Sequence, residues 1–244
     1  MISIILPAYR CANTLRDAVD SVLAQTECDW ELLIAEDGSG DDTASLVAAL
    51  AESDQRIHYL PAPVIDGVAV NAGAAAARNR ALTHAQGEWV AFLDADDIWL
   101  SEKLSQQLHF AHEQSAEMCC TAYIILTSPP RVRRVPVRAD YRALLGNNTV
   151  GMSSVLLRRE LLGDAPFETS FFHEDYVLWL KLTRDGRAFA GLDEPLVQYR
   201  TGGRSADKAN AARWRWAILR RGEKLSLPRA AYWFFRYACS ALRK

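Results

Sequence analysis

Three carboxylates follow a short apolar run in the middle of the chain. Val90–Leu93 is long enough for a buried strand and too short for a helix, and Asp94, Asp96 and Asp97 come directly after it. Because side chains alternate along a strand, Asp94 and Asp96 project on the same side, at the strand end where open parallel sheets bind ligands. Crowded carboxylates repel unless a cation compensates them, and oxygen ligands suit Mg²⁺ or Mn²⁺. The pattern predicts a divalent cation on a diphosphate; alternatively, these aspartates only turn the chain and cap a helix near Ser101.

A second pair of carboxylates, Glu174 and Asp175, opens an amphipathic helix. Helix dipoles favour carboxylates in the first turn, so the pair can be a plain helix start. Phe171 and Phe172 come immediately before it, which favours a partly dehydrated cleft. Dehydration raises the proton affinity of a carboxylate and makes it a better general base.

The composition limits the class of protein. The 244 residues are 50% hydrophobic, which predicts a sizeable core and one catalytic domain with a C-terminal appendage. A net charge of −2 argues against nucleic acid as a partner. Five scattered cysteines, none in a Cys-x-x-Cys pair, indicate neither a disulfide framework nor a zinc site. With no basic leader and no apolar run of about 18 to 20 residues, we expect a cytoplasmic protein.

The first sixty residues alternate between strand and helix patterns. Apolar runs at Ile2–Leu6, Trp30–Ala35 and Ile57–Leu60 predict strands, and the segments 15–23 and 44–52 have helical spacing. This order predicts right-handed crossovers and a parallel sheet, as in Rossmann dehydrogenases. The glycine-rich phosphate loop of those enzymes is missing, because residues 7–10 read Pro-Ala-Tyr-Arg after the first strand. A bound nucleotide must therefore be held by side chains and a metal ion.

Residues 71–82 form an alanine-rich helix pattern that leads into the aspartate-rich strand. Small side chains let this helix lie close to the sheet. Its first turns would direct backbone amides and Arg78 toward the crevice, since helix N-termini favour anions. Alternatively, Arg78 is an exposed helix arginine.

Four motifs in this order and spacing resemble the nucleotide-binding half of family 2 glycosyltransferases, which have the GT-A fold. They are Ile2–Tyr9 (ISIILPAY), Glu36–Ser39 (EDGS), Asn71–Asn79 (NAGAAAARN) and Phe92–Asp97 (FLDADD). The match covers roughly the first 110 residues. The resemblance implies a Rossmann-like α/β fold with a mostly parallel sheet flanked by helices, and a nucleotide-sugar donor, most often a UDP-sugar.

The resemblance also implies roles for individual residues. Asp37 would hydrogen-bond the uracil, Arg78 would meet the base or its neighbouring phosphate, Asp94 would lie near the ribose, and Asp96 would ligate the metal. The nucleotide pocket would be lined by Pro7, Ala8 and Tyr9. In the second half of the fold, Asp175 matches the catalytic base of the family's Glu-Asp motif, and Glu174 would orient the loop or the acceptor. The family usually has Asp where this chain has Glu36.

The second half of the chain, residues 111–203, would bind the acceptor. Helix 101–115 and strands over 118–126, 153–157 and 192–200 are expected there. Four arginines at 131, 133, 134 and 138 either form a solvated strand face or flank a phosphate-bearing acceptor. Many family members carry a histidine shortly after Tyr199-Arg200, but Thr201–Ser205 follow here, so Arg200 or Arg204 would supply positive charge instead. Gly202 and Gly203 suggest a loop that closes over the nucleotide.

Residues 204–244, called the tail below, combine eleven basic with two acidic residues. We expect two helices, the second restarting at Leu227-Pro228 with many aromatic residues. Aromatic and cationic residues at this density suit an interfacial helix on an anionic membrane, with peripheral contact through 228–244 on the cytoplasmic face of the inner membrane. Alternatively, the helix packs back on the catalytic domain of residues 1–203, whose nucleotide-binding half is 1–110.

The resulting hypothesis is an inverting, metal-dependent sugar transfer to a hydroxyl of a glycan or lipid-linked oligosaccharide in surface polysaccharide synthesis. Two alternatives remain. A nucleotidyltransferase would carry a glycine- and lysine-rich loop after the first strand, where Pro7–Arg10 stand instead. A non-catalytic nucleotide-sugar-binding protein of the same fold would not need Asp96 and Asp175 together.

Overall fold

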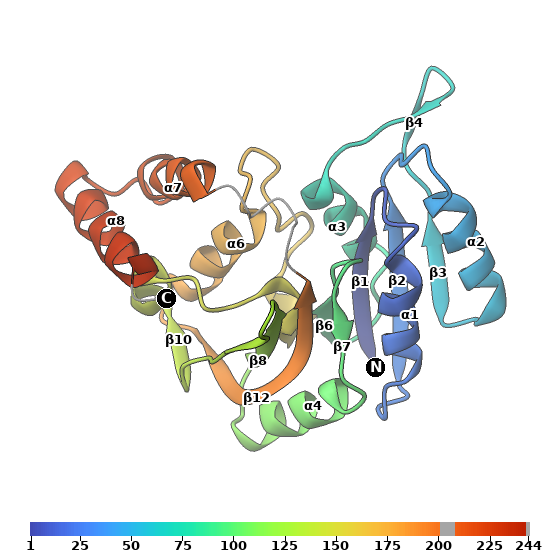
Figure 1. Cartoon of the computed structure of the whole chain (residues 1–244), viewed down its shortest axis with the longest axis horizontal. Helices are drawn as coiled ribbons and strands as arrows, with labels where there is room; N and C mark the ends of the chain where they lie inside the picture. Colours follow the sequence, from blue (N-terminus) through green and yellow to red (C-terminus); the bar gives the residue numbers. More distant parts are fainter. Residues whose placement is uncertain (201–207, 243–244) are drawn as a thin grey trace.

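The computed structural model describes residues 1–200 and 208–242. Within these residues, ten strands form one continuous sheet, with helices on both of its faces (Figure 1). The predicted α/β architecture is confirmed. The loop 201–207, with Arg204 and the Gly202-Gly203 pair of the predicted nucleotide lid, lies outside the described residues.

The N-terminal half of the sheet is parallel, as the strand and helix alternation predicted. The strands lie in the order β6-β1-β2-β3, and Ile2 at the start of β1 is in register with Trp30 of β2 and Trp89 of β6. Apolar residues of both strand faces are buried, as expected where helices cover both sides. The bounds are β1 (Ile2–Ala8), β2 (Trp30–Glu36), β3 (Ile57–Leu60) and β6 (Trp89–Phe92).

The C-terminal half of the sheet is mixed, which qualifies the expectation of a mostly parallel sheet. Strand β11 inserts antiparallel between β6 and β8, and β8 then pairs in parallel with the long strand β12. Three short strands, β7, β9 and β10, add antiparallel pairs. The bounds are β7 (Ile98–Trp99), β8 (Met118–Leu126), β9 (Arg131–Arg133), β10 (Arg138–Asp140), β11 (Val155–Arg158) and β12 (Ala188–Arg200).

Two hydrophobic clusters separate the helices by sheet face. One contains buried residues of α1 (Leu15–Leu23), α2 (Thr43–Ser53) and α4 (Lys103–Glu113). The other contains residues of α3 (Ala74–Leu82), α5 (Tyr141–Gly146), α6 (Glu174–Thr183) and the tail. Helices α3 and α6 therefore share one face, and each begins beside the carboxyl end of the parallel strands (Figure 1).

Several short elements were not expected from the sequence. A hairpin of β4 (Val64–Ile65) and β5 (Val68–Ala69) projects before α3 (Figure 1). Its turn places Asp66 and Gly67 at positive φ, which suits an Asp-Gly dipeptide. Helix α3 begins three residues later than predicted, because Gly73 at φ 88° turns the chain just before it. Single 3₁₀ turns occupy Met152–Ser154 and Arg159–Leu161.

The tail packs against α5, in the second half of the chain. It contains α7 (Lys208–Ala217), a π-helical turn at Ile218–Gly222 and α8 (Leu227–Leu242), which restarts where Leu227-Pro228 predicted. The buried guanidinium of Arg215 donates to the carbonyl oxygens of Leu144 and Leu145 at 3.0 and 2.6 Å. The alternative of a tail packed on the domain is therefore observed, while one face of α8 stays exposed. Within the described residues, no helix has the length and apolarity to cross a bilayer.

Candidate active site

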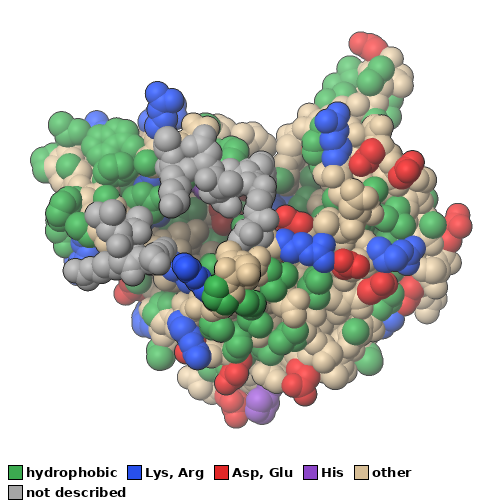
Figure 2. Space-filling view, in the orientation of Figure 1, with side chains coloured by type: hydrophobic (Ala, Val, Ile, Leu, Met, Phe, Trp, Pro, Cys, Tyr) green, Lys and Arg blue, Asp and Glu red, His purple; other side chains and the backbone are tan. Residues whose placement is uncertain are grey.

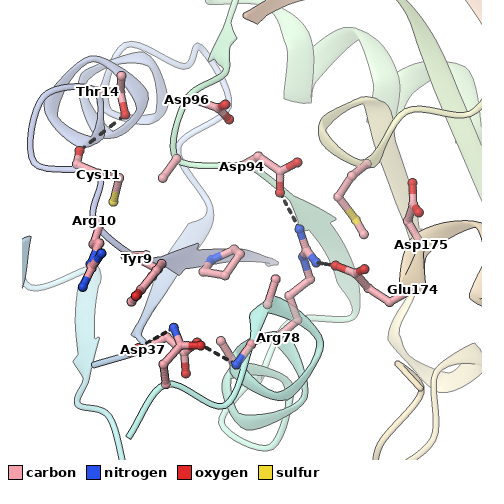
Figure 3. Close-up of a pocket in the computed structure, with 18 of the residues that line it drawn as sticks. Tyr9, Arg10, Cys11, Thr14, Asp37, Arg78, Asp94, Asp96, Glu174 and Asp175 are labelled. Carbon is pink, nitrogen blue, oxygen red and sulfur yellow. Dashed lines mark hydrogen bonds and ion pairs between the residues drawn. The ribbon is translucent and has the colours of Figure 1, made fainter. Parts of the chain in front are cut away.

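A cavity of about 570 Å³ opens at the carboxyl ends of the parallel strands, between the two halves of the fold (Figure 3). Asp96, which follows β6, and Asp175 of α6 both line it. The structure thus brings together the nine residues assigned to the nucleotide, the metal and catalysis: Pro7, Ala8, Tyr9, Asp37, Arg78, Asp94, Asp96, Glu174 and Asp175. In the space-filling view the surface is hollowed between the same two halves (Figure 2).

Asp37 fixes the loop that precedes α3. Its carboxylate accepts the backbone N–H groups of Ala72 and Gly73 at 3.0 and 2.8 Å. The Asn71 side-chain amide donates to the Asp37 carbonyl oxygen at 3.0 Å. Since these bonds connect β2 to the start of α3, the carboxylate that the resemblance assigned to a nucleotide base also shapes the wall of the cavity.

Arg78 connects the two halves of the site. Its buried guanidinium donates from Nη1 to Glu174 Oε1 at 2.6 Å and from Nη2 to Asp94 Oδ1 at 2.5 Å (Figure 3). A planar guanidinium can hold two carboxylates at once, which an ammonium group cannot match. From the sequence, Arg78 was expected to contact a ligand. In the structure, both of its terminal nitrogens donate to carboxylates of the protein.

The residue after Arg78 strengthens the same connection. The Asn79 side chain donates to the Phe167 carbonyl oxygen at 2.8 Å and accepts the Phe167 N–H at 3.0 Å. Neighbouring residues of α3 therefore hold both ends of the segment 167–174 that leads into α6. In this chain, the arginine and the asparagine of the Ala-Arg-Asn motif therefore serve to hold that segment in place.

The three aspartates after β6 have three different environments. Asp94 pairs with Arg78, and Asp96 lines the cavity. Asp97 is buried, accepts the Ser153 hydroxyl at 2.5 Å, and accepts the Arg200 N–H at 3.3 Å. Burial and the nearby Asp94 charge raise the pKa of Asp97 above its ordinary value. Asp97 therefore connects the tip of β6 to the end of β12, instead of facing the cavity.

Ser153 supports this turn and was missed in the sequence. Its hydroxyl donates to Asp97 and accepts the Asp94 N–H at 3.1 Å, so one side chain positions two of the three aspartates. A serine in the 3₁₀ turn before β11 carries no sequence signal for this role, because its partners are about sixty positions away.

The oxygen donors at the end of β6 fit a hard divalent cation. Mg²⁺ sites typically use one or two carboxylates together with phosphate oxygens of the substrate. Asp96 on the cavity wall, with the partly exposed Asp94 carboxylate beside it, provides such a set. Arg78 already neutralises part of the local negative charge, which is consistent with a site completed by a diphosphate.

Asp175 lies across the cavity, in the first turn of α6. Burial, followed by the charge of the neighbouring Glu174, raises the pKa of Asp175 to about 7, although Arg78 acts in the opposite direction. A carboxylate with this pKa can accept a proton near neutral pH. The dehydrated environment inferred from Phe171 and Phe172 is consistent with this shift.

The aromatic segment before α6 also contacts the tail. The Phe172 ring stacks on Trp214 of α7 with centroids 6.0 Å apart and 18° between the planes, and it meets the His173 ring edge-on at 5.1 Å. Phe172 and His173 both line the cavity. His173 thus brings an imidazole to the cavity. It lies on a different segment from the one after Arg200, where many family members carry a histidine and this chain does not.

Arg200 and the four arginines at 131, 133, 134 and 138 lie outside this cavity. Arg200 donates to Asp17 Oδ2 at 2.6 Å. Arg134 pairs with Asp193 at 3.1 Å, and Arg138 donates to the Gly186 carbonyl oxygen at 3.1 Å. The exposure of Arg131, Arg134 and Arg138 favours the solvated face over the acceptor site, while Arg133 is half-buried.

Comparisons with known proteins agree with this geometry. The model of the family described as Glycosyl transferase family 2 matches residues 3–162. TuaG of Bacillus subtilis, named as a teichuronic acid biosynthesis glycosyltransferase, is 34% identical over 250 residues, covering 100% of this chain and 97% of that protein. WfgD of Escherichia coli, named as a UDP-Glc:alpha-D-GlcNAc-diphosphoundecaprenol beta-1,3-glucosyltransferase, is 38% identical, covering 78% of this chain and 72% of its own length.

Solved structures show the same fold at low sequence identity. S. aureus TarS 1–349 in complex with UDP-GlcNAc has a TM-score of 0.70 and 18% identity, covering 97% of this chain and 71% of that one. The mannosyltransferase PcManGT from Pyrobaculum calidifontis, in complex with GDP-Man and Mn²⁺, has a TM-score of 0.65 and 18% identity, covering 99% and 75%.

Proposed function

The chain belongs to glycosyltransferase family 2, and from that premise we propose that it transfers a sugar from a UDP-sugar to a hydroxyl group of a lipid-linked glycan, with inversion at the anomeric carbon. The observation that carries this proposal is the shared cavity, with Asp96 on one wall and Asp175 on the other. One wall is suited to a nucleotide diphosphate, and the other is suited to an acceptor hydroxyl.

The donor assignment rests on the nucleotide-binding half of the cavity. Pro7, Ala8 and Tyr9 at the end of β1 would line the nucleotide, and Asp37 with its tethered loop would meet the base. The relative WfgD is named for UDP-Glc, which favours uracil over guanine. A thermal-shift screen with UDP-glucose, UDP-GlcNAc and GDP-mannose in the presence of Mn²⁺ tests this assignment. Stabilisation by the GDP-sugar alone would contradict it.

We expect Asp96→Asn to abolish metal-dependent donor binding. The amide keeps the size of the side chain but removes the negative charge that a hard cation requires. Thermal stabilisation by UDP-sugar should then be the same with Mn²⁺ and with a chelator, whereas the parent should need the metal. Asp20→Asn, at an exposed position of α1, is the matched control and should behave as the parent. A full manganese response in Asp96→Asn would remove Asp96 from the ligand set.

In the proposed mechanism, Asp175 takes the proton of the acceptor hydroxyl while the hydroxyl oxygen attacks the anomeric carbon. The bond from that carbon to the diphosphate oxygen breaks, and the nucleoside diphosphate leaves from the opposite face. Bound Mg²⁺ or Mn²⁺ would neutralise the charge that develops on the leaving group. Arg78 keeps Glu174 and Asp94 fixed, so the base and the end of β6 retain their relative positions.

The raised pKa of Asp175 predicts the pH dependence of the reaction. The base must be deprotonated to act, and with a pKa of about 7 it is increasingly protonated below neutral pH. We therefore expect kcat/KM to fall about tenfold per pH unit below about pH 7 and to level off above it. Initial rates from pH 5 to 9 at constant ionic strength measure this profile. A flat profile down to about pH 5 would contradict the assignment.

The acceptor and the membrane contact complete the proposal. WfgD is named for an acceptor linked to diphosphoundecaprenol. An enzyme that uses such an acceptor must work at a membrane surface, and the exposed face of α8 supports peripheral contact through 228–244 on the cytoplasmic side. Figure 2 shows hydrophobic and basic side chains together over α7 and α8 at the left of the view.

A further inference from the structure

A second cavity, of about 600 Å³, lies between α5 and α8, outside the active site. Its walls carry two guanidinium groups, Arg142 from α5 and Arg236 from α8. Tyr232 and Trp233 contribute aromatic surface, and Ala143, Gly146 and Asn147 complete the lining. Two cations beside aromatic rings form a site for an anion attached to an apolar group.

No carboxylate of the described residues pairs with the two arginines of this cavity. In the part of the chain that the structure describes, neither Arg142 nor Arg236 forms a salt bridge; Arg236 donates to the Tyr232 hydroxyl at 3.4 Å and lies 5.8 Å from the Trp233 ring centroid. The nearby Asp140 carboxylate caps α5 by accepting the Ala143 N–H at 2.9 Å. These contacts leave both arginines without a carboxylate partner among the described residues.

The tail around the cavity strengthens the positive charge. Between residues 208 and 242, Glu223 is the sole acidic residue, against eight basic ones. The Glu223 side chain is 2% exposed and is held by Arg184 at 2.9 Å and by the Tyr141 hydroxyl at 2.5 Å. The acidic group of this segment is therefore turned inward, and the basic groups determine the charge of its surface.

An exposed apolar stripe runs along α8 beside the cavity. Leu227, Ala231 and Phe235 recur every four residues and therefore share one face of the helix. The side chains of Leu227 and Phe235 are 59% and 67% exposed, and Tyr232 next to them is 54% exposed while also lining the cavity. Helix α8 is apolar on the face packed against the domain and also on an exposed face, which arginines border. Such a helix suits the interface of a bilayer.

We propose that this cavity binds the phosphate of an anionic membrane phospholipid, with the apolar stripe of α8 inserted among the neighbouring acyl chains. Arg142 and Arg236 would hold the headgroup phosphate from opposite sides. The combination of cationic pocket and apolar stripe selects this occupant, because a free nucleotide or phosphate would leave the stripe exposed to water. The inference rests on the proposed membrane contact and names its headgroup site, which includes α5 as well as the tail.

Flotation of the full chain with lipid vesicles tests this site. We expect the protein to bind vesicles of phosphatidylcholine and phosphatidylglycerol and to bind pure phosphatidylcholine weakly. Arg142→Ala and Arg236→Ala should each lower partitioning about fivefold, the contribution of one basic residue near an anionic surface. Phe235→Ser should lower it as well. Arg131→Ala, an exposed arginine on β9, is the matched control and should bind as the parent.

Three outcomes would overturn the proposal. The first is equal binding of the parent to neutral and anionic vesicles, and the second is unchanged binding of both arginine variants. Because these vesicles contain no lipid-linked sugar, binding that appears only after addition of a lipid diphosphate would assign the cavity to the acceptor instead. Flotation requires neither donor nor turnover, so the result is independent of the catalytic assignments. Donor-induced thermal stabilisation of Arg142→Ala should match the parent.

Discussion

Asp175→Asn should lower the rate of sugar transfer by about 10² to 10⁴, the usual contribution of a positioned general base. Asparagine keeps the shape of the side chain but cannot take the proton from the acceptor hydroxyl. The loss should appear in kcat, because Asp175 acts on the acceptor proton during bond formation. Donor affinity should stay near the parent value, since the residues proposed to hold the nucleotide lie on the opposite wall of the cavity. Initial rates at saturating donor and acceptor, with donor binding measured separately, provide both quantities.

A matched control is Asp185→Asn, an exposed carboxylate shortly after α6, which should retain the parent rate. The acidic limb of the pH profile should also disappear from the residual activity of Asp175→Asn. A variant that keeps its rate within about tenfold of the parent would remove Asp175 as the base. If donor binding were lost together with the rate, the substitution would have disturbed the cavity, and the base would have to be tested at another residue.

Arg78→Met should lower the free energy of unfolding by about 3–5 kcal/mol, the usual effect of removing one partner of a buried ion pair. Methionine fills similar space but leaves the buried Glu174 carboxylate and the Asp94 carboxylate without their shared cation. Arg78→Lys should also be destabilised, because one ammonium group cannot reproduce the two-sided guanidinium contact. Chemical denaturation followed by circular dichroism measures these changes.

A second substitution separates lost charge compensation from lost packing. In Arg78→Met combined with Glu174→Gln, one of the two orphaned charges is removed, so part of the stability should return. Arg16→Met, at an exposed position of α1, is the control and should be neutral. A loss below about 1 kcal/mol in Arg78→Met would mean that the bridge contributes little to the connection between the two halves.

The local elements were predictable because their apolar patterns are short and regular. Strand β3 matches its predicted bounds, and β8 matches the run Met118–Leu126. The antiparallel insertion of β11 was not predictable, because the apolar pattern of a buried strand is the same in either direction. The projecting hairpin was missed because its Asp-Gly turn lies between only two pairs of strand residues.

The sequence predicted which residues line the cavity, but it did not predict which residues they contact. Motifs bring Asp94, Asp96 and Asp175 to the cavity because strand ends and helix starts converge there. The pairing of Arg78 with Glu174 joins residues 96 positions apart, and spacing within a motif carries no information about it. The same holds for Asp97 and Ser153. In each case a charged group singled out from the sequence satisfies another buried polar group of the protein.

The stacking of Phe172 on Trp214 limits how far this chain can be shortened from its C-terminal end. The sequence suggested a catalytic unit that ends near residue 203, with the remainder as an accessory. Yet the ring supporting the segment before Glu174 comes from α7, and Arg215 in the same helix satisfies two carbonyl oxygens of α5. Helix α7 thus supports both α5 and the segment that leads into α6, on the Asp175 side of the cavity. A chain that ended near residue 203 would lose these contacts and leave that wall of the cavity without its support.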